Sequence, residues 1–465
     1  MILGIGMDNT FLVGMIALGL MLVLIILGVR VVFAAALVGF LGLVELRGWG
    51  PGGGMAGIVP HSKSSVYALS VLPMFIFIGF IAFHAGMTQT LFDAARKWLG
   101  WMPGGLAVAT VFATAGFAAV SGASTATSAV FSRVAIPEML RAGYSKQMSA
   151  GVVASAGTLA TLIPPSAILV IYAIIVETSV GDLLLAGFLP GIVSAIVYAG
   201  IIVLWSIAKP DQAPSVKGFT WGERIASLPG VSPILAVMII IMGSIYTGWA
   251  TPTEAGALGA FVILVLAIAR GTKLKAIKGS LMESAKLTVM IFSLIWGVLI
   301  FVRFLGFSGL PGAFTEWIVS LPTNPMIILL CILLGYAVLG MFMDAIGMLL
   351  LTLPVVYPAV MALNGGPYVS AADSAFGVSG NMAPVWFGII AVKMAEICLI
   401  TPPIGLNCFV VNGVRPDIPI TTVFKGVAIF FVADVLTIAV LIMFPQIVTW
   451  LPEFDFEAWW GAFGS

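Results

Sequence analysis

Two short stretches interrupt long apolar runs and decide how this chain folds: Thr161–Ser166 reads TLIPPS, and Thr401–Asn407 reads TPPIGLN. Each contains a Pro-Pro pair. Proline has no amide hydrogen, so it breaks the hydrogen-bond ladder of a helix and frees a preceding carbonyl oxygen. Irregular backbone at membrane depth is tolerated only where protein or a water-filled cavity surrounds it. The two stretches therefore predict two broken helices inside the protein.

The composition places these broken helices in a membrane. Of the 465 residues, 61% are hydrophobic and only 8% are charged, whereas soluble domains carry about 25% charged residues. Because one membrane span needs about 20 apolar residues, the chain has room for about a dozen crossings or re-entrant pieces. We expect an all-α polytopic membrane protein. The net charge of +1 provides no field that would attract nucleic acid.

Apolar runs predict the individual spans. Continuous runs lie at residues 11–28, 31–46, 66–85, 183–207, 231–249, 252–269, 287–306 and 420–447. We expect the first of these to be retained rather than cleaved as a signal peptide. Broken helices are expected at 148–178 and 383–412. Two runs interrupted by small or polar residues predict hairpins at 103–137 and 325–362 that enter and leave on the same side of the membrane.

Residues 66–178 and 287–412 repeat the same order of parts. Each has a span, a short amphipathic segment (86–101 or 309–321), a proline that opens a hairpin (Pro103 or Pro325) and a broken helix. Such repeats with discontinuous helices are typical of secondary transporters, whose sites lie where the repeats meet. We therefore predict a secondary transporter with scaffold helices at 1–65, repeat 1 of the transport domain at 66–180, scaffold helices and a cytoplasmic loop at 181–285, repeat 2 at 286–415, and a C-terminal scaffold helix with a periplasmic tail at 416–465.

The basic residues predict the orientation. With the N-terminus outside and both hairpins re-entrant, 16 of the 20 Lys and Arg residues lie on the inner side, all but Arg47, Lys63, Arg303 and Lys393. Because Lys and Arg accumulate in cytoplasmic loops, both termini should be periplasmic. The first hairpin then enters from the cytoplasm and the second from outside, so the repeat is inverted.

Oxygen-bearing side chains gather at the first hairpin tip and the first break. The tip, residues 118–128, reads AAVSGASTATS. Hydroxyl and carbonyl oxygens at such an interruption suit a hard cation such as Na⁺, although small residues also serve plain helix packing. The matching helix break favours ion binding. The first candidate sodium site comprises Ser121, Ser124, Thr127, Thr161, Pro164 and Ser166.

The second half repeats this device with different residues. Its hairpin tip, residues 340–347, reads GMFMDAIG, and Asp344 is its only charged residue. An ionisable residue inside a bilayer indicates a functional site, although Asp344 could instead be a structural cap. The second candidate sodium site comprises Gly340, Asp344, Thr401, Pro402 and Asn407. Lys393 and Glu396 are close enough on one helix to form a structural ion pair.

The sequence offers only a few candidate residues for the substrate site. Ser124 and Thr125 at the first tip are candidate substrate ligands. Arg303, a second charge within an apolar run, could meet an anionic substrate, although its long side chain could equally reach the outer interface.

Five stretches of this sequence resemble the DctM-type large membrane subunit of tripartite ATP-independent periplasmic (TRAP) transporters. They are AAVSGASTATSAVFSRVAIPEMLRAGYS (118–145), AGTLATLIPPSAILVIYA (156–173), LLLAGFLPGI (183–192), GMFMDAIGMLLLTLPVVYP (340–358) and EICLITPPIGLNCFVV (396–411). The resemblance implies a Na⁺-driven elevator in the bacterial inner membrane, with sodium at the two hairpin tips against the two broken helices. It also implies uptake of an organic anion, commonly a carboxylate, with a small four-helix membrane subunit and a periplasmic substrate-binding protein as partners. The chain differs in having longer loops at 47–65 and 364–384. We expect the small subunit to be a separate polypeptide, and no organic cofactor.

Two other functions compete with this one. The chain could be an ion-coupled carrier of organic anions or oxyanions that works without a binding protein. It could also be an intramembrane serine protease that uses Ser121 or Ser124 with His84, which would require the hydroxyl and the imidazole within hydrogen-bond reach. Direct use of ATP is not supported, because the sequence has no GxxxxGK[ST] loop. We expect a transporter and not an enzyme.

Overall fold

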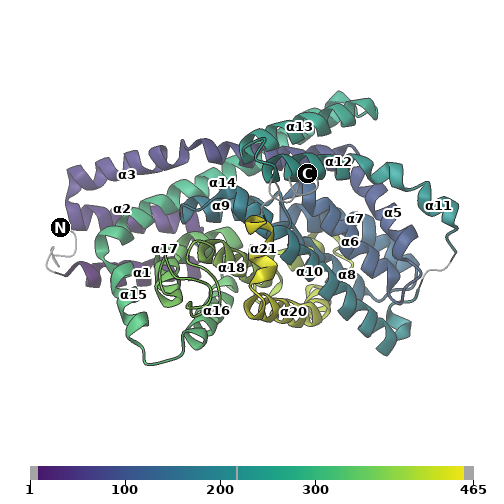
Figure 1. Ribbon diagram of the computed structural model, residues 1–465. Coiled ribbons are helices and arrows are strands. Elements are labelled where there is room, and N and C mark those ends of the chain that lie inside the picture. Colours follow the sequence, from purple (N-terminus) through teal and green to yellow (C-terminus); the bar gives the residue numbers. More distant parts are fainter. Residues whose placement is uncertain (1–8, 216–217, 455–465) are drawn as a thin grey trace, which may run out of the picture.

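The computed structural model describes residues 9–215 and 218–454, which form helices, turns and loops without any strand (Figure 1). Eight helices in these residues are long and apolar enough to cross a membrane, which confirms a polytopic helical membrane protein. The two chain ends, including the predicted periplasmic tail, and Lys217 lie outside the described residues.

The predicted repeat is present in the order of the helices. The first half consists of α4 (Val71–His84), α5 (Met87–Leu99), the hairpin α6 (Gly105–Ser121) and α7 (Ser124–Arg141), the broken helix α8 (Lys146–Ala156) and α9 (Ala167–Ile175), and α10 (Val180–Ala208). The second half consists of α14 (Leu274–Ser308), α15 (Leu310–Ser320), the hairpin α16 (Pro325–Gly340) and α17 (Ala345–Asn364), the broken helix α18 (Ala383–Ile400) and α19 (Leu406–Val414), and α20 (Ile420–Met443). The repeat is therefore longer than predicted, because α10 and α20 follow the two broken helices in matching positions. Re-entry of the hairpins into the membrane stays a prediction.

The remaining described helices flank the two halves. They are α1 (Thr10–Ile26), α2 (Val31–Arg47), α3 (Trp49–Ser64), the short α11 (Trp221–Ile225), α12 (Leu228–Tyr246), α13 (Pro252–Ala269) and α21 (Gln446–Glu453). In Figure 1, α1, α2 and α3 lie side by side at one end of the molecule, and α5, α6 and α11 lie at the other.

One expected loop is a helix. Residues 47–65 are rich in glycine, which disfavours helix by about 1 kcal/mol per residue, yet α3 occupies most of this stretch. Packing explains the difference. A Cβ atom on Gly52 would lie 2.8 Å from the Leu43 carbonyl oxygen of α2, so the glycine lets the two helices approach closely. Small residues at such contacts are a common means of helix association in membranes.

The helices that follow the breaks pack directly on the broken helices. Helix α20 lies against α8 and α18, and α10 lies against α9, α18 and α20. The contact between α8 and α20 is very close, because a Cβ atom on Gly151 would lie 2.4 Å from the Gly426 carbonyl carbon. The sequence assigns α10 and α20 to the scaffold, and both helices pack on the broken helices. The division into scaffold and transport domains stays a prediction.

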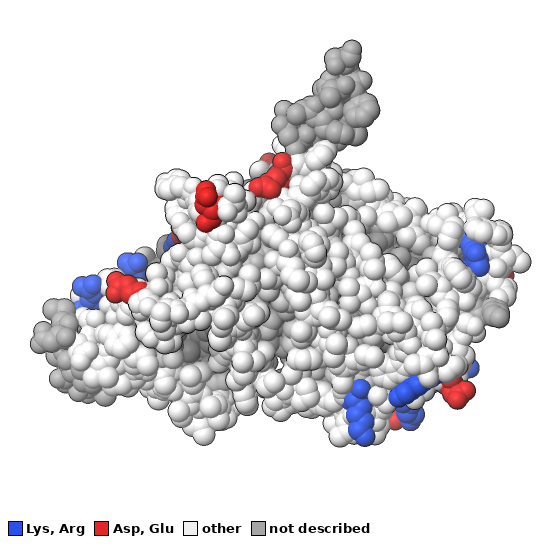
Figure 2. Space-filling model, turned by 60° about the horizontal axis from the view of Figure 1, so that its bottom comes forward, with Lys and Arg blue, Asp and Glu red and all other residues white. Residues whose placement is uncertain are grey.

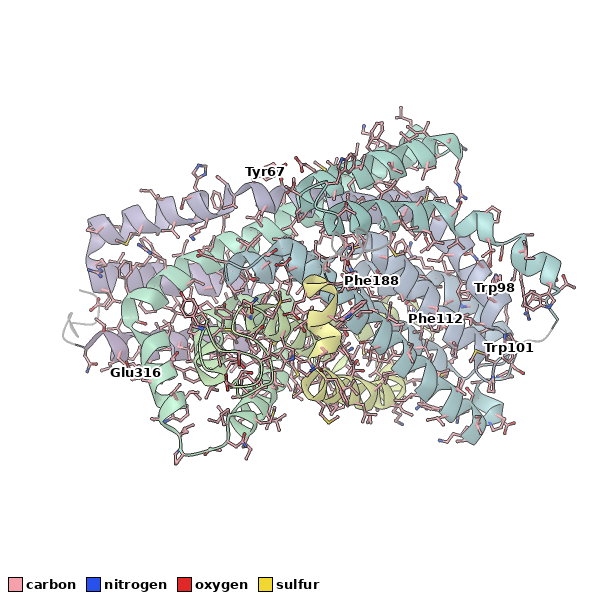
Figure 3. The ribbon with its side chains drawn as sticks, viewed as in Figure 1. Tyr67, Trp98, Trp101, Phe112, Phe188 and Glu316 are labelled. Carbon is pink, nitrogen blue, oxygen red and sulfur yellow. The ribbon has the colours of Figure 1, made fainter. Side chains whose placement is uncertain are left out.

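The surface has the distribution of charged and aromatic side chains that is expected where a protein contacts lipid. Figure 2 shows charged side chains toward opposite margins of one face, with a wide uncharged area between them. Aromatic side chains such as Tyr67 and Trp101 (Figure 3) point outward and are 64% and 57% exposed. Tyr and Trp are enriched where membrane proteins meet the lipid headgroups, so this surface agrees with a multi-pass membrane protein.

Candidate functional site

The first hairpin tip lies directly on the first helix break. Helix α6 ends at Ser121, and its C-cap Gly122 adopts a left-handed conformation with φ 57°. A Cβ atom there would lie 2.4 Å from the Pro165 carbonyl oxygen, so only glycine fits. The adjacent hydroxyls are buried, and Ser121 Oγ lies 2.8 Å from Thr127 Oγ1. The structure thus brings the tip and the break together, as the sequence predicts.

The first break contributes two further hydroxyls. After the 3₁₀ turn Gly157–Thr161, the chain passes through the buried Pro164 to Ser166, the N-cap of α9. The Ser166 hydroxyl donates to the Thr161 carbonyl oxygen, and the Thr161 hydroxyl donates to Glu396 Oε1 at 2.8 Å. A hydroxyl oxygen that donates its proton still has lone pairs, so both oxygens remain able to face a cation.

The second break is built differently. Helix α18 ends at Ile400, and the chain turns through Thr401 and the left-handed Gly405 before α19 begins. The Thr401 hydroxyl donates to the Ile397 carbonyl oxygen at 2.6 Å. Pro402 is exposed, whereas Pro164 in the first break is buried. The backbone of the second break is therefore open on one side.

The second hairpin packs against α18 just before this break. A Cβ atom on Gly340 would lie 1.7 Å from Cys398 Sγ, so this glycine lets the hairpin approach α18. Asp344 is the N-cap of α17, and its Oδ2 accepts a hydrogen bond from the Gly347 amide at 3.1 Å. The carboxylate thus has a capping function in the structure, whether or not it also binds a cation.

Asn407 connects the two halves. Its Nδ2 donates to Ser124 Oγ at 2.8 Å and to the Ala154 carbonyl oxygen at 3.1 Å. The sequence grouped Asn407 with Asp344, but the structure places it beside the first hairpin. The amide oxygen of Asn407 is buried and has no hydrogen-bond partner among the described residues. A cation could satisfy such an oxygen, and side-chain amide and hydroxyl oxygens are ligands that hard cations accept.

Two more serine hydroxyls lie near the first site. Ser128 Oγ and Ser155 Oγ are buried and, within the described part of the chain, unpartnered. Ser128 is one of the hydroxyls of the predicted tip, although the candidate sodium site left it out. It lies against the first broken helix, because a Cβ atom on Gly157 would be 1.9 Å from its Oγ. Ser155 was not singled out from the sequence.

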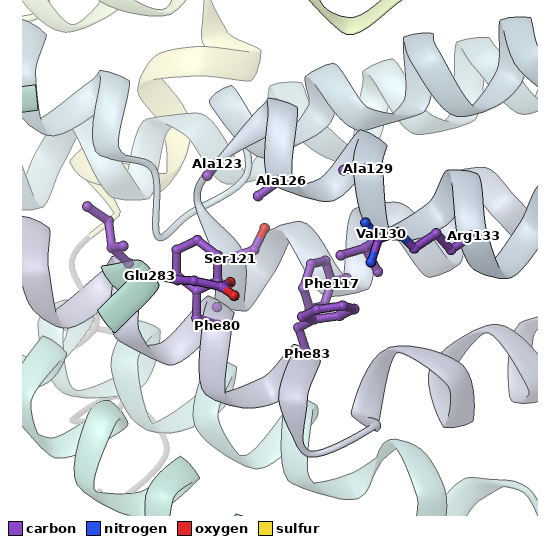
Figure 4. A pocket seen from close by; sticks show the side chains of 12 residues that line it. Phe80, Phe83, Phe117, Ser121, Ala123, Ala126, Ala129, Val130, Arg133 and Glu283 are labelled. Atoms are coloured by element: carbon purple, nitrogen blue, oxygen red, sulfur yellow. The ribbon is translucent and has the colours of Figure 1, made fainter. Parts of the chain in front are cut away.

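A cavity of about 190 Å³ extends to the first hairpin tip. Its walls come from α4, the hairpin α6–α7 and α14, and Ser121 belongs to both the cavity and the tip. In Figure 4, Glu283 lies beside Phe80, and Arg133 lies beyond Phe83 and Phe117. All five residues line the cavity. The sequence did not single out either residue for a site: Arg133 was counted only among the basic residues of the inner side, and Glu283 was not considered.

The predicted substrate residues are not all brought to this cavity. Ser124 and Thr125 begin α7 at the tip, next to the cavity wall. Arg303 is exposed and stacks on Phe307, with its guanidinium carbon 4.8 Å from the ring centroid. Glu283 and Arg303 are 20 residues apart on the continuous helix α14, which corresponds to about 30 Å along the axis. Arg303 is thus remote from the cavity.

The hydroxyls and the histidine of the protease alternative have other partners. Ser121 pairs with Thr127, and Ser124 pairs with Asn407. His84 Nε2 lies 3.4 Å from Glu283 Oε1. In the described residues, neither serine hydrogen-bonds to the imidazole, so the geometry lacks the nucleophile–base contact that such catalysis uses.

Paired helix breaks, each met by a hairpin, define this molecule as a helical membrane transporter with an internal repeat. The family of the DctM component of the tripartite ATP-independent periplasmic transporter matches residues 12–447, and the chain belongs to that family.

Similar proteins agree with this assignment. The large permease protein of a C4-dicarboxylate TRAP transporter from Pseudomonas aeruginosa is 34% identical over 391 residues, covering 84% of this chain and 85% of that protein. An ectoine TRAP permease from Halomonas elongata is 31% identical, covering 87% and 89%. A sialic acid TRAP permease from Vibrio cholerae is 29% identical, covering 83% and 86%. The YdaH transporter of Alcanivorax borkumensis has a similar fold, with a TM-score of 0.57 at 14% identity, covering 93% of this chain and 98% of that one.

Proposed function

We propose that this chain uses a Na⁺ gradient to import a small organic anion, a carboxylate, across the bacterial inner membrane. The observation that carries the proposal is the buried oxygen cluster at the first tip, where the hairpin closes on a helix break and the Asn407 amide oxygen, beside Ser124, has no partner among the described residues. Sodium is a transported ion here rather than a resident cofactor. Two relatives named above carry C4-dicarboxylates and sialic acid by name, which supports a carboxylate substrate.

The cavity supplies a place for the organic substrate next to the first candidate sodium site. Ser121 contributes to both, so binding of ion and substrate would order the same hairpin tip. Arg133 offers a guanidinium for the carboxylate, and such charge-assisted bonds are among the stronger hydrogen bonds. The phenyl rings would cover the apolar body of the substrate. We therefore assign the anion-binding function to Arg133 in preference to Arg303.

An elevator motion is the mechanism we propose for moving this cavity across the membrane. Polar contacts such as Ser124–Asn407 and Thr161–Glu396 tie the first hairpin and both broken helices together. Asp434 on α20 adds contacts to Tyr198 on α10 and Lys393 on α18. Where α4 meets the hairpin, in contrast, a Cβ atom on Gly79 would lie 2.6 Å from the Ser121 Cα. At this close contact between small residues, few hydrogen bonds between polar groups would have to break. This contact is where we expect the two parts to slide, so α4 would belong to the scaffold rather than to repeat 1 of the transport domain, where the sequence had placed it.

The family's three-part organisation supports two protein partners, a small four-helix membrane subunit and a periplasmic substrate-binding protein. The binding protein would deliver the substrate from the periplasm, and the small subunit would lie with this chain in the lipid of the inner membrane. Both termini are proposed to be periplasmic.

Uptake by vesicles tests this proposal. The chain is reconstituted with the small subunit and binding protein of its own operon, and uptake of candidate carboxylates is measured at fixed pH with Na⁺ or with K⁺ or choline outside. We expect uptake only with Na⁺. Undiminished uptake in choline would reject sodium coupling, and Na⁺-driven uptake without the binding protein would identify a stand-alone carrier.

A further inference from the structure

The predicted topology places four basic residues away from the inner side of the membrane: Arg47, Lys63, Arg303 and Lys393. The structure gives two of them carboxylate partners, because Lys63 lies 2.8 Å from Glu177 and Lys393 lies 2.7 Å from Asp434. Arg47 and Arg303 take part in none of the ion pairs among the described residues. These two arginines therefore need another account of their charges.

Arg47 and Arg303 approach each other over one phenyl ring. The guanidinium carbon of Arg47 lies 4.2 Å from the ring centroid of Phe307, and that of Arg303 lies 4.8 Å from it. The two guanidinium groups are therefore no farther apart than the sum of these distances, and each lies within cation–π range of the ring. Both arginines are exposed, so a ligand from outside the chain can reach them.

Glycines on α2 fix the place where the two arginines meet. A Cβ atom on Gly39 would lie 2.6 Å from the Phe301 Cα, and one on Gly42 would lie 2.4 Å from the Phe304 ring. Helix α2 therefore lies directly on α14, and residue numbers rise in the same direction along the contact. This register sets Arg47, the last residue of α2, beside Phe307. The arginine pair is thus positioned by the packing of two helices.

The nearby carboxyl groups do not compensate these charges. Glu45, two residues before Arg47, is buried and has an interaction of its own. Glu316 on α15 is exposed (Figure 3) and belongs to no ion pair of the described residues. Two like charges that share one ring repel each other, and apolar surroundings strengthen the repulsion. An anion from outside the chain would relieve it.

The arginine pair stands where two membrane spans end. Arg47 closes α2, and Arg303 lies near the end of the predicted span at residues 287–306. Trp49, two residues after Arg47, is 73% exposed, and tryptophan is enriched at the level of the lipid headgroups. The pair therefore lies at the depth at which the phosphate groups of a bilayer are found.

An apolar face of α2 leads away from the arginine pair. Phe40 and Phe33 precede Arg47 at intervals of seven residues, so the three residues share one face of the helix. Phe33 is 63% exposed, and Phe40 is partly exposed. A cationic end thus adjoins an apolar strip, and this order matches the phosphate and the acyl chains of a phospholipid.

We propose that Arg47 and Arg303 bind the phosphate group of an anionic phospholipid. Each guanidinium can donate two parallel hydrogen bonds to phosphate oxygens, so one phosphate between them receives donors from both α2 and α14. The acyl chains lie along Phe40 and Phe33. Basic residues beside a membrane span attract anionic headgroups, and the bound phosphate removes the repulsion between the two guanidinium groups.

Lipid binding to the purified full-length chain tests the proposal. The chain is stripped of lipid in detergent, and native mass spectrometry measures its affinity for phosphatidylglycerol and for diacylglycerol with the same acyl chains, which lacks the phosphate. We expect the wild type to bind phosphatidylglycerol much more tightly than diacylglycerol. Arg47→Gln and Arg303→Gln should each weaken binding of phosphatidylglycerol by about fivefold, and the double variant should weaken it further. Lys275→Gln, which removes an exposed charge outside this pair, should leave the affinity unchanged.

Several outcomes would overturn the proposal. One is equal affinity of the two arginine variants and Lys275→Gln for phosphatidylglycerol, and another is equally tight binding of diacylglycerol. Inorganic phosphate that binds as tightly as the lipid would identify a site for small anions instead. Arginine variants that lose the small membrane subunit on purification but keep their lipid affinity would identify a subunit interface. Equal melting temperatures in lipid-free detergent, expected because both arginines are exposed, would show that a lost affinity is not a lost fold.

Discussion

Asn407, at the start of α19 in the second half, donates a hydrogen bond of 2.8 Å to Ser124, the first residue of α7 in the first half. The bond joins the two repeats at the first hairpin tip, where several hydroxyls lie together with an amide oxygen that has no partner in the described part of the chain. We expect this pair to connect sodium binding with the position of the hairpin.

A double-mutant cycle tests this connection. Asn407→Ala removes a donor to two buried acceptors, each of which then costs about 1–3 kcal/mol if nothing replaces it. We expect the Na⁺ concentration for half-maximal uptake to rise at least severalfold in Asn407→Ala and less in Ser124→Ala. Because the residues are in contact, the double mutant should show a coupling of about 0.5–3 kcal/mol. Strictly additive effects would mean that the two side chains act independently.

Two substitutions of Asp344 can separate the effect of its charge from the effect of its helix-capping function. Asparagine caps a helix about as well as aspartate, whereas alanine costs about 0.5–2 kcal/mol. Asp344→Asn should therefore reach the membrane in normal amounts and need much more Na⁺ for half-maximal uptake. Asp344→Ala should show the same sodium defect together with lower thermal stability. If Asp344→Asn keeps wild-type sodium dependence, Asp344 is a cap alone.

The fit of the first hairpin on its helix break depends on Gly122. Alanine at this left-handed position is strained by about 1–2 kcal/mol, and its Cβ would meet the Pro165 carbonyl oxygen at 2.4 Å. We expect Gly122→Ala to lower the melting temperature and to abolish uptake. Gly413→Ala is the matched control, since a Cβ there has no atom within 4 Å. Equal behaviour of the two variants would argue against a closed tip.

Substitutions of Arg133 and Arg303 should affect the KM for the substrate differently. If Arg133 binds the carboxylate, Arg133→Gln should raise the KM for the anion by about ten- to a hundredfold, because hydrogen bonds to charged groups contribute about 1.5–3 kcal/mol. Arg303→Gln should leave the KM nearly unchanged, since Arg303 lies far from the cavity on α14. The reverse order of effects would return the substrate site to Arg303.

The orientation can be tested by labelling single cysteines in intact cells. In a background with Cys331→Ser, which removes an exposed native thiol, an impermeant reagent should label Ala372→Cys in the predicted outer loop. The same reagent should reach Lys275→Cys only after the cells are opened. Both positions are exposed, so access depends on the side of the membrane. Labelling of Lys275→Cys in intact cells would reverse the topology.

The sequence alone determined the helical architecture, because its signals are local. A run of apolar residues must be long enough to cross lipid, and a Pro-Pro pair must break the helix in which it stands. The hairpin glycines Gly122 and Gly340, the breaks and the order of the repeat could thus be predicted within a few residues. The helix α3 could not, since close packing on α2 overrides the low helix propensity of its glycines.

Only the tertiary structure decided which side chains meet. Asn407 donates a hydrogen bond to Ser124 of the first hairpin, Arg133 lines the cavity, and Asp434 on α20 contacts Lys393 on α18. In a membrane protein, lipid and protein interior are both apolar, so hydropathy hardly distinguishes the buried face of a helix from its outer face. Which faces turn inward is therefore fixed by packing among helices far apart in the chain.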